Sequence, residues 1–153
     1  MSELRETINN AYKTSLKDKN KVRVGTLRLI QAALKDRDIN ARTKGNQEGI
    51  SDDEILALLQ TMIKQRGESI RLYTEGGRDE LAAQEQAEIE VISEFLPKQL
   101  SEEELQAVLK DLIAQTGAQS IKDMGKIMGR LKNDYVGQVD MGKAGAQIKS
   151  MLG

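Results

Sequence analysis

Apolar side chains recur at helical spacing through most of the chain, and no segment shows the alternation of a half-buried strand. The first helices place Leu4 and Ile8, and then Leu27 and Ile30, on one face. The spacing predicts seven helices: residues 2–18, 21–38, from Ser51 to Gly76, 78–94, from Ser101 to Gly117, one that opens at Ser120, and one from Asp140 to Leu152. The sequence therefore predicts an all-α protein.

Local start and stop signals divide this helical pattern. Ser51 and Ser101 are each followed three residues later by Glu, which is the arrangement of a capping box. Residues 40–49 are polar, have no period and contain two glycines, so we expect a loop there. Pro97, the one proline, ends the fourth helix because it lacks an amide donor. We expect the domain boundary here: a four-helix N-terminal domain of helical hairpins at 1–96, and a compact three-helix C-terminal domain at 97–153.

Composition makes the core aliphatic. The chain has three Tyr, one Phe and no Trp, so Leu, Ile, Val, Met and Ala must fill the interior. The net charge of −1 is unevenly spread: residues 1–45 carry 11 basic and 5 acidic side chains, whereas residues 46–96 carry 4 and 12. Such blocks are usually solvated or mutually compensating faces, so we interpret them as packing in one bundle.

The chain lacks the residues that several common kinds of catalytic and metal site require. Without Cys or His the chain lacks thiolate chemistry and the commonest general base and metal ligand. We therefore expect no catalytic residues, no metal and no cofactor, and no autonomous activity. No apolar run approaches the roughly 18 residues needed to span a bilayer, and the first residues lack a signal-like apolar stretch. We expect a cytoplasmic protein without a membrane partner.

One tetrapeptide, Asp-Met-Gly-Lys, occurs at 123–126 and again at 140–143. In the first copy we interpret Ser120 as the helix N-cap, which leaves Gly125 and Gly129 on one helical face. Each mid-helix Gly costs about 0.8–1 kcal/mol relative to Ala, so the pair needs a reason. Close packing against another helix is the favoured explanation, and access for a ligand backbone is the other.

The second copy predicts a helix start, with Asp140 as N-cap and with Gly142 and Lys143 at the second and third positions. Unpaired amides at a helix start attract anions, although the Asp140 carboxylate could satisfy the same amides. Around both copies, residues 120–153 carry six cations and three carboxylates, a balance of +3. Lys122, Lys126 and Arg130 form a stripe at i, i+4 and i+8. Such a stripe fits phosphate recognition of structured RNA better than base stacking.

Four ordered segments also resemble the YqeY family of small bacterial proteins. They are Leu27 to Lys35; Met62 to Ser69 with Tyr73, Gly77 and Arg78; Glu94 to Ser101; and Asp123 to Gly129. That family is similar to the C-terminal helical and tail regions of the B subunit of the aspartyl/glutamyl-tRNA amidotransferase, whose tail contacts the outer corner of tRNA. The resemblance implies a tRNA-binding or tRNA-related accessory protein without the catalytic cradle.

By position, the tail motif falls on Gly125, Lys126 and Gly129. The tail motif, the basic stripe and the second copy, with Lys132 as a further cation after the motif, give the candidate RNA-binding residues: Gly125, Lys126, Gly129, Arg130, Lys132, Gly142 and Lys143. The partners implied are tRNA and an amidotransferase or other tRNA enzyme. Two alternatives stay open: a helical protein–protein adaptor, and a carbon–nitrogen ligase-type activity with glutamine as the amido-nitrogen donor.

Overall fold

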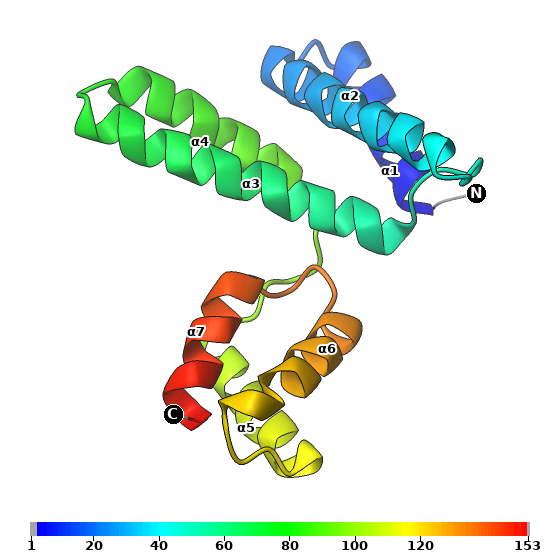
Figure 1. Ribbon diagram of the computed structural model, residues 1–153. Helices are drawn as coiled ribbons and strands as arrows, with labels where there is room; N and C mark the ends of the chain where they lie inside the picture. Colours follow the sequence, from blue (N-terminus) through cyan, green and yellow to red (C-terminus); the bar gives the residue numbers. More distant parts are fainter. Residues whose placement is uncertain (1–2, 153) are drawn as a thin grey trace. The chain divides into compact units, whose positions relative to one another are not determined.

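The structure, a computed structural model, describes residues 3–152, and its regular elements are helices (Figure 1). Its elements are α1 (Glu3–Lys17), α2 (Lys21–Thr43), α3 (Asp52–Glu75), α4 (Asp79–Ser93), α5 (Glu102–Thr116), the 3₁₀ turn η1 (Ile121–Asp123), α6 (Met124–Asp134) and α7 (Met141–Leu152). No strand occurs in this described range. The all-α prediction is confirmed.

Side-chain caps fix where several helices begin. The Ser51 hydroxyl accepts a hydrogen bond from the Glu54 amide at 3.2 Å, and the Glu54 carboxylate accepts one from the Ser51 amide at 3.3 Å. Ser101 and Glu104 make the same reciprocal pair at the start of α5. At the other end of α5, Gly117 adopts a φ of 68°, a left-handed conformation that suits glycine. Both predicted capping boxes are confirmed.

Helix α2 is longer than its sequence predicts. The expected loop at 40–49 begins four residues later, because residues 40–43 continue the helix. Ala41 packs against the core, and the Thr43 hydroxyl donates to the Asn40 carbonyl at 2.6 Å. The packing of Ala41 against the core thus extends α2 through residues whose sequence shows no helical spacing of apolar side chains.

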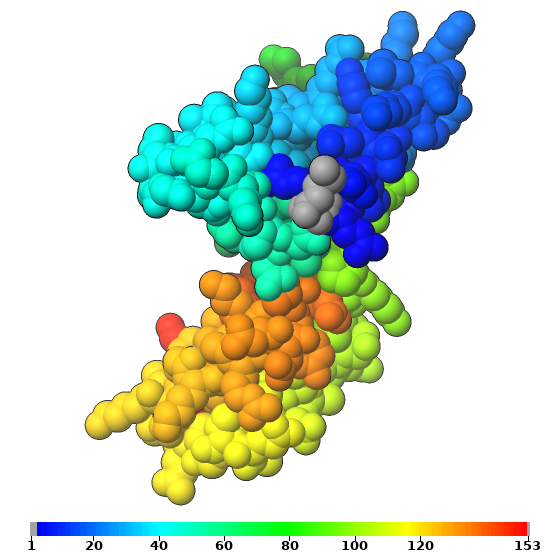
Figure 2. Space-filling view, turned by 90° about the vertical axis from the view of Figure 1, so that its right-hand side faces the viewer, coloured from blue at the N-terminus to red at the C-terminus, as the bar shows by residue number. Residues whose placement is uncertain are grey.

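The first core lies among α1 to α4, which form two helical hairpins (Figure 1). Figure 2 shows dark-blue α1 lying against the paler blue and cyan residues of α2. The fully or nearly fully buried side chains are Ile8, Leu27, Ile30, Leu34, Ile50, Ile55, Leu58, Leu59, Met62, Val91 and Ile92. They come from both the basic 1–45 segment and the acidic 46–96 segment, and Arg23 pairs with Glu94 across these segments. As expected, the interior is aliphatic.

One ion pair ties α1 to the end of α2. Arg5 donates to both carboxylate oxygens of Asp38, at 2.7 and 2.6 Å, and Asp38 also accepts from the Ile50 amide at 3.0 Å. Arg5 further donates to the Ile50 carbonyl at 3.1 Å. These bonds hold the α2–α3 connection against α1, and the hydrogen bonds from Arg5 lower the pKa of Asp38 below its ordinary value.

The second core is formed by α5, α6 and α7, with the orange residues of α6 packed on yellow α5 in Figure 2. Its buried side chains are Leu105, Leu109, Leu112, Ile127, Leu131, Val139, Ala144 and Ile148. The Leu100 amide donates to the Gln138 carbonyl at 2.9 Å and so closes the start of this unit on the α6–α7 turn. Contacts within the chain accordingly divide it into two compact units, one up to Leu96 and one from Pro97 onward.

Substituting Asp38 should reveal the ion pair through its pH dependence. Because the folded-state pKa of Asp38 lies below its unfolded value of about 3.9, the stabilisation is complete above that value and is lost as pH falls through the folded pKa. We expect Asp38→Ala to lower the free energy of unfolding by about 1.5–3 kcal/mol at pH 7, and by progressively less below about pH 4. Urea titrations across this pH range measure the difference. Asp36→Ala, at an exposed side chain of the same helix, is the control and should cost little at any pH.

We expect the segment 97–153 to fold alone, because its core is built from its own helices. Expressed by itself, it should give a helical circular dichroism spectrum and a cooperative thermal transition. Leu109→Ala, at a side chain with no exposed surface, should cost about 2–5 kcal/mol in the same fragment. A broad transition that is insensitive to this substitution would contradict an independent domain.

Candidate nucleic-acid interface

The helix that carries the first Asp-Met-Gly-Lys begins differently from its prediction. Ser120 makes no side-chain cap bond, and the 3₁₀ turn η1 precedes α6. Asp123 instead accepts a hydrogen bond from the Gln119 amide at 3.0 Å, which lowers the pKa of its carboxyl group. Ser120 thus lies at the start of η1, as an N-cap would, but its hydroxyl makes none of the capping bonds that the prediction expects, and Asp123 is the residue that precedes α6.

Gly125 and Gly129 both lie exposed on α6. Among the residues that the structure describes, no atom beyond the two chain neighbours and the local helix backbone lies within 4 Å of the position that a Cβ would occupy at either residue. Neither backbone has the positive φ that would require glycine. The favoured explanation, close packing of another helix, therefore finds no support within this unit, whose packed face of α6 is formed by Ile127 and Leu131.

Exposed cations lie on both sides of the two glycines on α6. Successive helical residues are about 100° apart, so Lys132 lies on one side of the two glycines, and Lys126 and Arg130 lie on the other. All three cations are exposed. The nearest carboxylate to Arg130 is Asp134, at 3.9 Å with both side chains about half exposed, which is a weak and readily screened interaction. We call this surface, consisting of Gly125, Lys126, Gly129, Arg130 and Lys132, the α6 face.

The second copy is a capped helix start. Asp140 accepts hydrogen bonds from the amides of Gly142 and Lys143, at 2.8 and 3.2 Å, as the N-cap prediction requires. Because the carboxylate occupies these amides, they are not open to another anion. The two residues belong to α7, on a different helix from the α6 face. The second copy therefore adds no open backbone amides to the α6 face.

The glycine used for close packing is Gly145, which the sequence reasoning missed. It is buried in α7, and a Cβ there would lie 3.2 Å from the Met124 Cε atom of α6. Gly145 follows Ala144 in a run of small residues, and that run is a signal for close helix contact. Gly137, in the turn before α7, has a φ of 74°, which favours glycine for conformational reasons.

The described residues offer no site of two other kinds. Among residues 3–152, no group of three or more acidic, His or Cys side chains is placed to hold a metal ion. Within that range, too, no helix is both long and apolar enough to cross a membrane. The α6 face thus stands as the candidate that the sequence and the geometry have in common.

Comparison with known proteins shows which family and which relative the chain is similar to. The family model described as Yqey-like protein matches residues 5–152. A curated relative, "Altered inheritance of mitochondria protein 41, mitochondrial" from the fungus Pyrenophora tritici-repentis, is 27% identical over 145 residues, which cover 92% of this chain and 76% of the relative. The family match extends over nearly the whole sequence. The chain therefore belongs to the YqeY family.

Proposed function

We propose that this protein binds tRNA through the α6 face and acts as a non-catalytic accessory to an amidotransferase or another tRNA enzyme. The observation that carries the proposal is the pair of exposed glycines on α6 between cations. Gly129 lies in the interior of this eleven-residue helix, where glycine costs about 0.8–1 kcal/mol relative to Ala. Gly125 lies in the first turn, where the cost is smaller, and no neighbour in the unit requires either glycine. A ligand that approaches the helix backbone explains both.

The charge around the glycines favours phosphate as that ligand. Lys126, Arg130 and Lys132 would contact neighbouring phosphates while the missing side chains let the backbone of the nucleic acid come close. Structured RNA is read largely through shape and phosphate contacts, which suits a face without exposed aromatic side chains. The resemblance to the tail of the amidotransferase B subunit supports tRNA as the RNA. A cytoplasmic location stays a prediction.

Removing two cations should weaken binding. We expect Lys126→Ala combined with Arg130→Ala to reduce affinity for total tRNA about tenfold at low salt, and to reduce the slope of log affinity against log salt by about 1.5–2. Filter binding at several salt concentrations measures both quantities. If the unaltered protein binds no tRNA at low salt, the proposal fails, and affinity capture that recovers one protein partner would then favour an adaptor.

Replacing both exposed glycines of α6 by alanine should raise the stability of the protein and weaken its binding to tRNA. Gly125→Ala combined with Gly129→Ala should raise the free energy of unfolding by about 1–2 kcal/mol, because alanine is the better helix former and each site has room for a Cβ. The same variant should bind tRNA several-fold more weakly. Thermal unfolding and filter binding measure the two effects.

Gly67→Ala is the matched control for this pair. Gly67 is also an exposed helical glycine with open space around it, but it lies in α3. Gly67→Ala should therefore stabilise the protein without weakening tRNA binding. Equal binding by the double alanine variant and the control would show that the open glycines of α6 do not face the RNA.

A further inference from the structure

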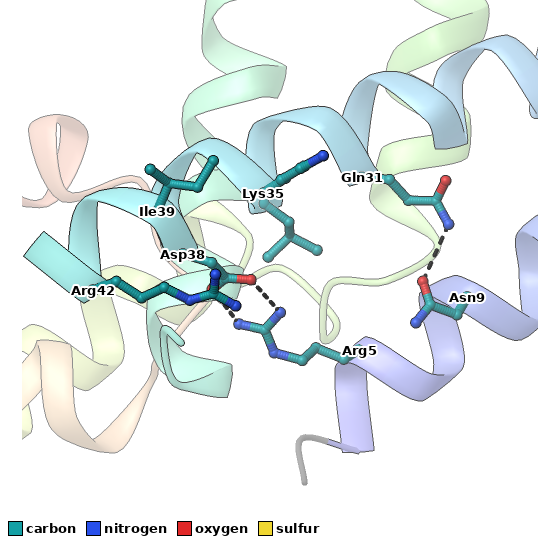
Figure 3. A pocket seen from close by; sticks show the side chains of 8 residues that line it. Arg5, Asn9, Gln31, Lys35, Asp38, Ile39 and Arg42 are labelled. Carbon is teal, nitrogen blue, oxygen red and sulfur yellow. Dashed lines mark hydrogen bonds and ion pairs between the residues drawn. The ribbon is translucent and has the colours of Figure 1, made fainter. Parts of the chain in front are cut away.

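A second cationic feature lies in the first unit, in a surface notch between α1 and α2 of about 310 Å³ (Figure 3). Buried Leu34 contributes to its lining, and the rest of the lining is mostly polar. The notch is at the lower end of the volumes typical of ligand sites. Six of its eight lining residues are polar or charged and offer hydrogen-bond groups to a ligand.

The negative charge of the one carboxylate in the lining, that of Asp38, is already balanced by Arg5. Asp38 accepts both hydrogen bonds from Arg5 and a third from the Ile50 amide. Those bonds hold its pKa low, so it stays ionised and bound to Arg5 at neutral pH. The pair also fixes the Arg5 guanidinium at the notch, as Figure 3 shows.

Two further cations leave the notch with a positive balance. Lys35 and Arg42 also line it, so three cations face one carboxylate and the balance is +2. Both side chains are exposed, and neither has a hydrogen bond or ion pair to another residue in the described part of the chain. After the hydrogen bonds from Arg5, the Arg42 charge also helps lower the pKa of Asp38, so Lys35 is the cation with the least competition for an anion from solution.

Neutral donors complete the lining at the other end. The Gln31 side-chain amide donates to the Asn9 carbonyl oxygen at 3.1 Å, which leaves the Asn9 amide nitrogen on the side toward Arg5 (Figure 3). That nitrogen has two hydrogens to donate. Guanidinium, ammonium and amide donors around a small open space are the chemistry that holds a phosphate group.

We propose that this notch binds a phosphate group, and that the phosphate belongs to the RNA backbone. The choice of RNA rests on the proposed function, whereas the binding of phosphate does not. The notch lies on α1 and α2, so it would be a contact additional to the α6 face. It assigns a role to part of the basic 1–45 segment.

Titration of the full-length protein with inorganic phosphate tests the site without RNA. We expect the NMR signals of the Asn9 side-chain amide and of the Arg5 guanidinium to shift together, with an affinity on the order of millimolar, as suits exposed charges. Lys35→Gln combined with Arg42→Gln should abolish these shifts. Lys17→Gln combined with Lys21→Gln should preserve them, since Lys21 lies about 21 Å along α2 from Lys35 at 1.5 Å per residue. If these signals do not respond to phosphate, the proposal is overturned.

The same variants identify the source of the phosphate. If it is RNA, Lys35→Gln with Arg42→Gln should weaken tRNA binding about 3- to 10-fold more than the Lys17 and Lys21 control does. Phosphate binding without this loss would overturn the choice of RNA and would indicate a small phosphorylated ligand. Phosphate binding by a protein that binds no tRNA would overturn the α6 proposal and keep the notch as a phosphate site.

Discussion

Burial of aliphatic helix faces is the constraint on which both units depend. With only four aromatic side chains, the chain must offset the entropy of ordering its helices with Leu, Ile, Val and Met. Leu27 and Ile30 of α2 are wholly buried, as are Ile127 and Leu131 of α6. Each helix therefore has one side fixed by packing. Only the opposite side is left for function.

That division makes the glycines informative. Gly145 faces inward and lets α7 approach α6 closely, so its small size serves packing. Gly125 and Gly129 face outward, where alanine would stabilise the helix. Residues that lower stability without serving the fold are often retained for function. The α6 face combines such residues with cations, whereas in the second Asp-Met-Gly-Lys the helix-start amides are already satisfied by Asp140.

Sequence reasoning succeeded where local chemistry decides the structure. The capping boxes at Ser51 and Ser101 act within four residues, and the stop at Gly117 follows from its freedom to adopt positive φ. It failed where distant residues decide. The end of α2 is held by burial of Ala41, and the bonds between Arg5 and Asp38 join residues 33 positions apart. At Ser120 a helical turn does begin, but the hydroxyl makes no capping bond, and a backbone amide nearby is bound by Asp123 instead.

The sequence by itself determined the helical class, most helix limits, the aliphatic core and the resemblance to the YqeY family, because periodicity and caps are encoded within a few residues. It also identified the candidate residues of α6. Only the tertiary structure decided which glycines are packed and which are open, and only it placed Asn9, Lys35 and Arg42 around one notch. The reason is physical: the exposure of a side chain depends on neighbours that helix packing brings together.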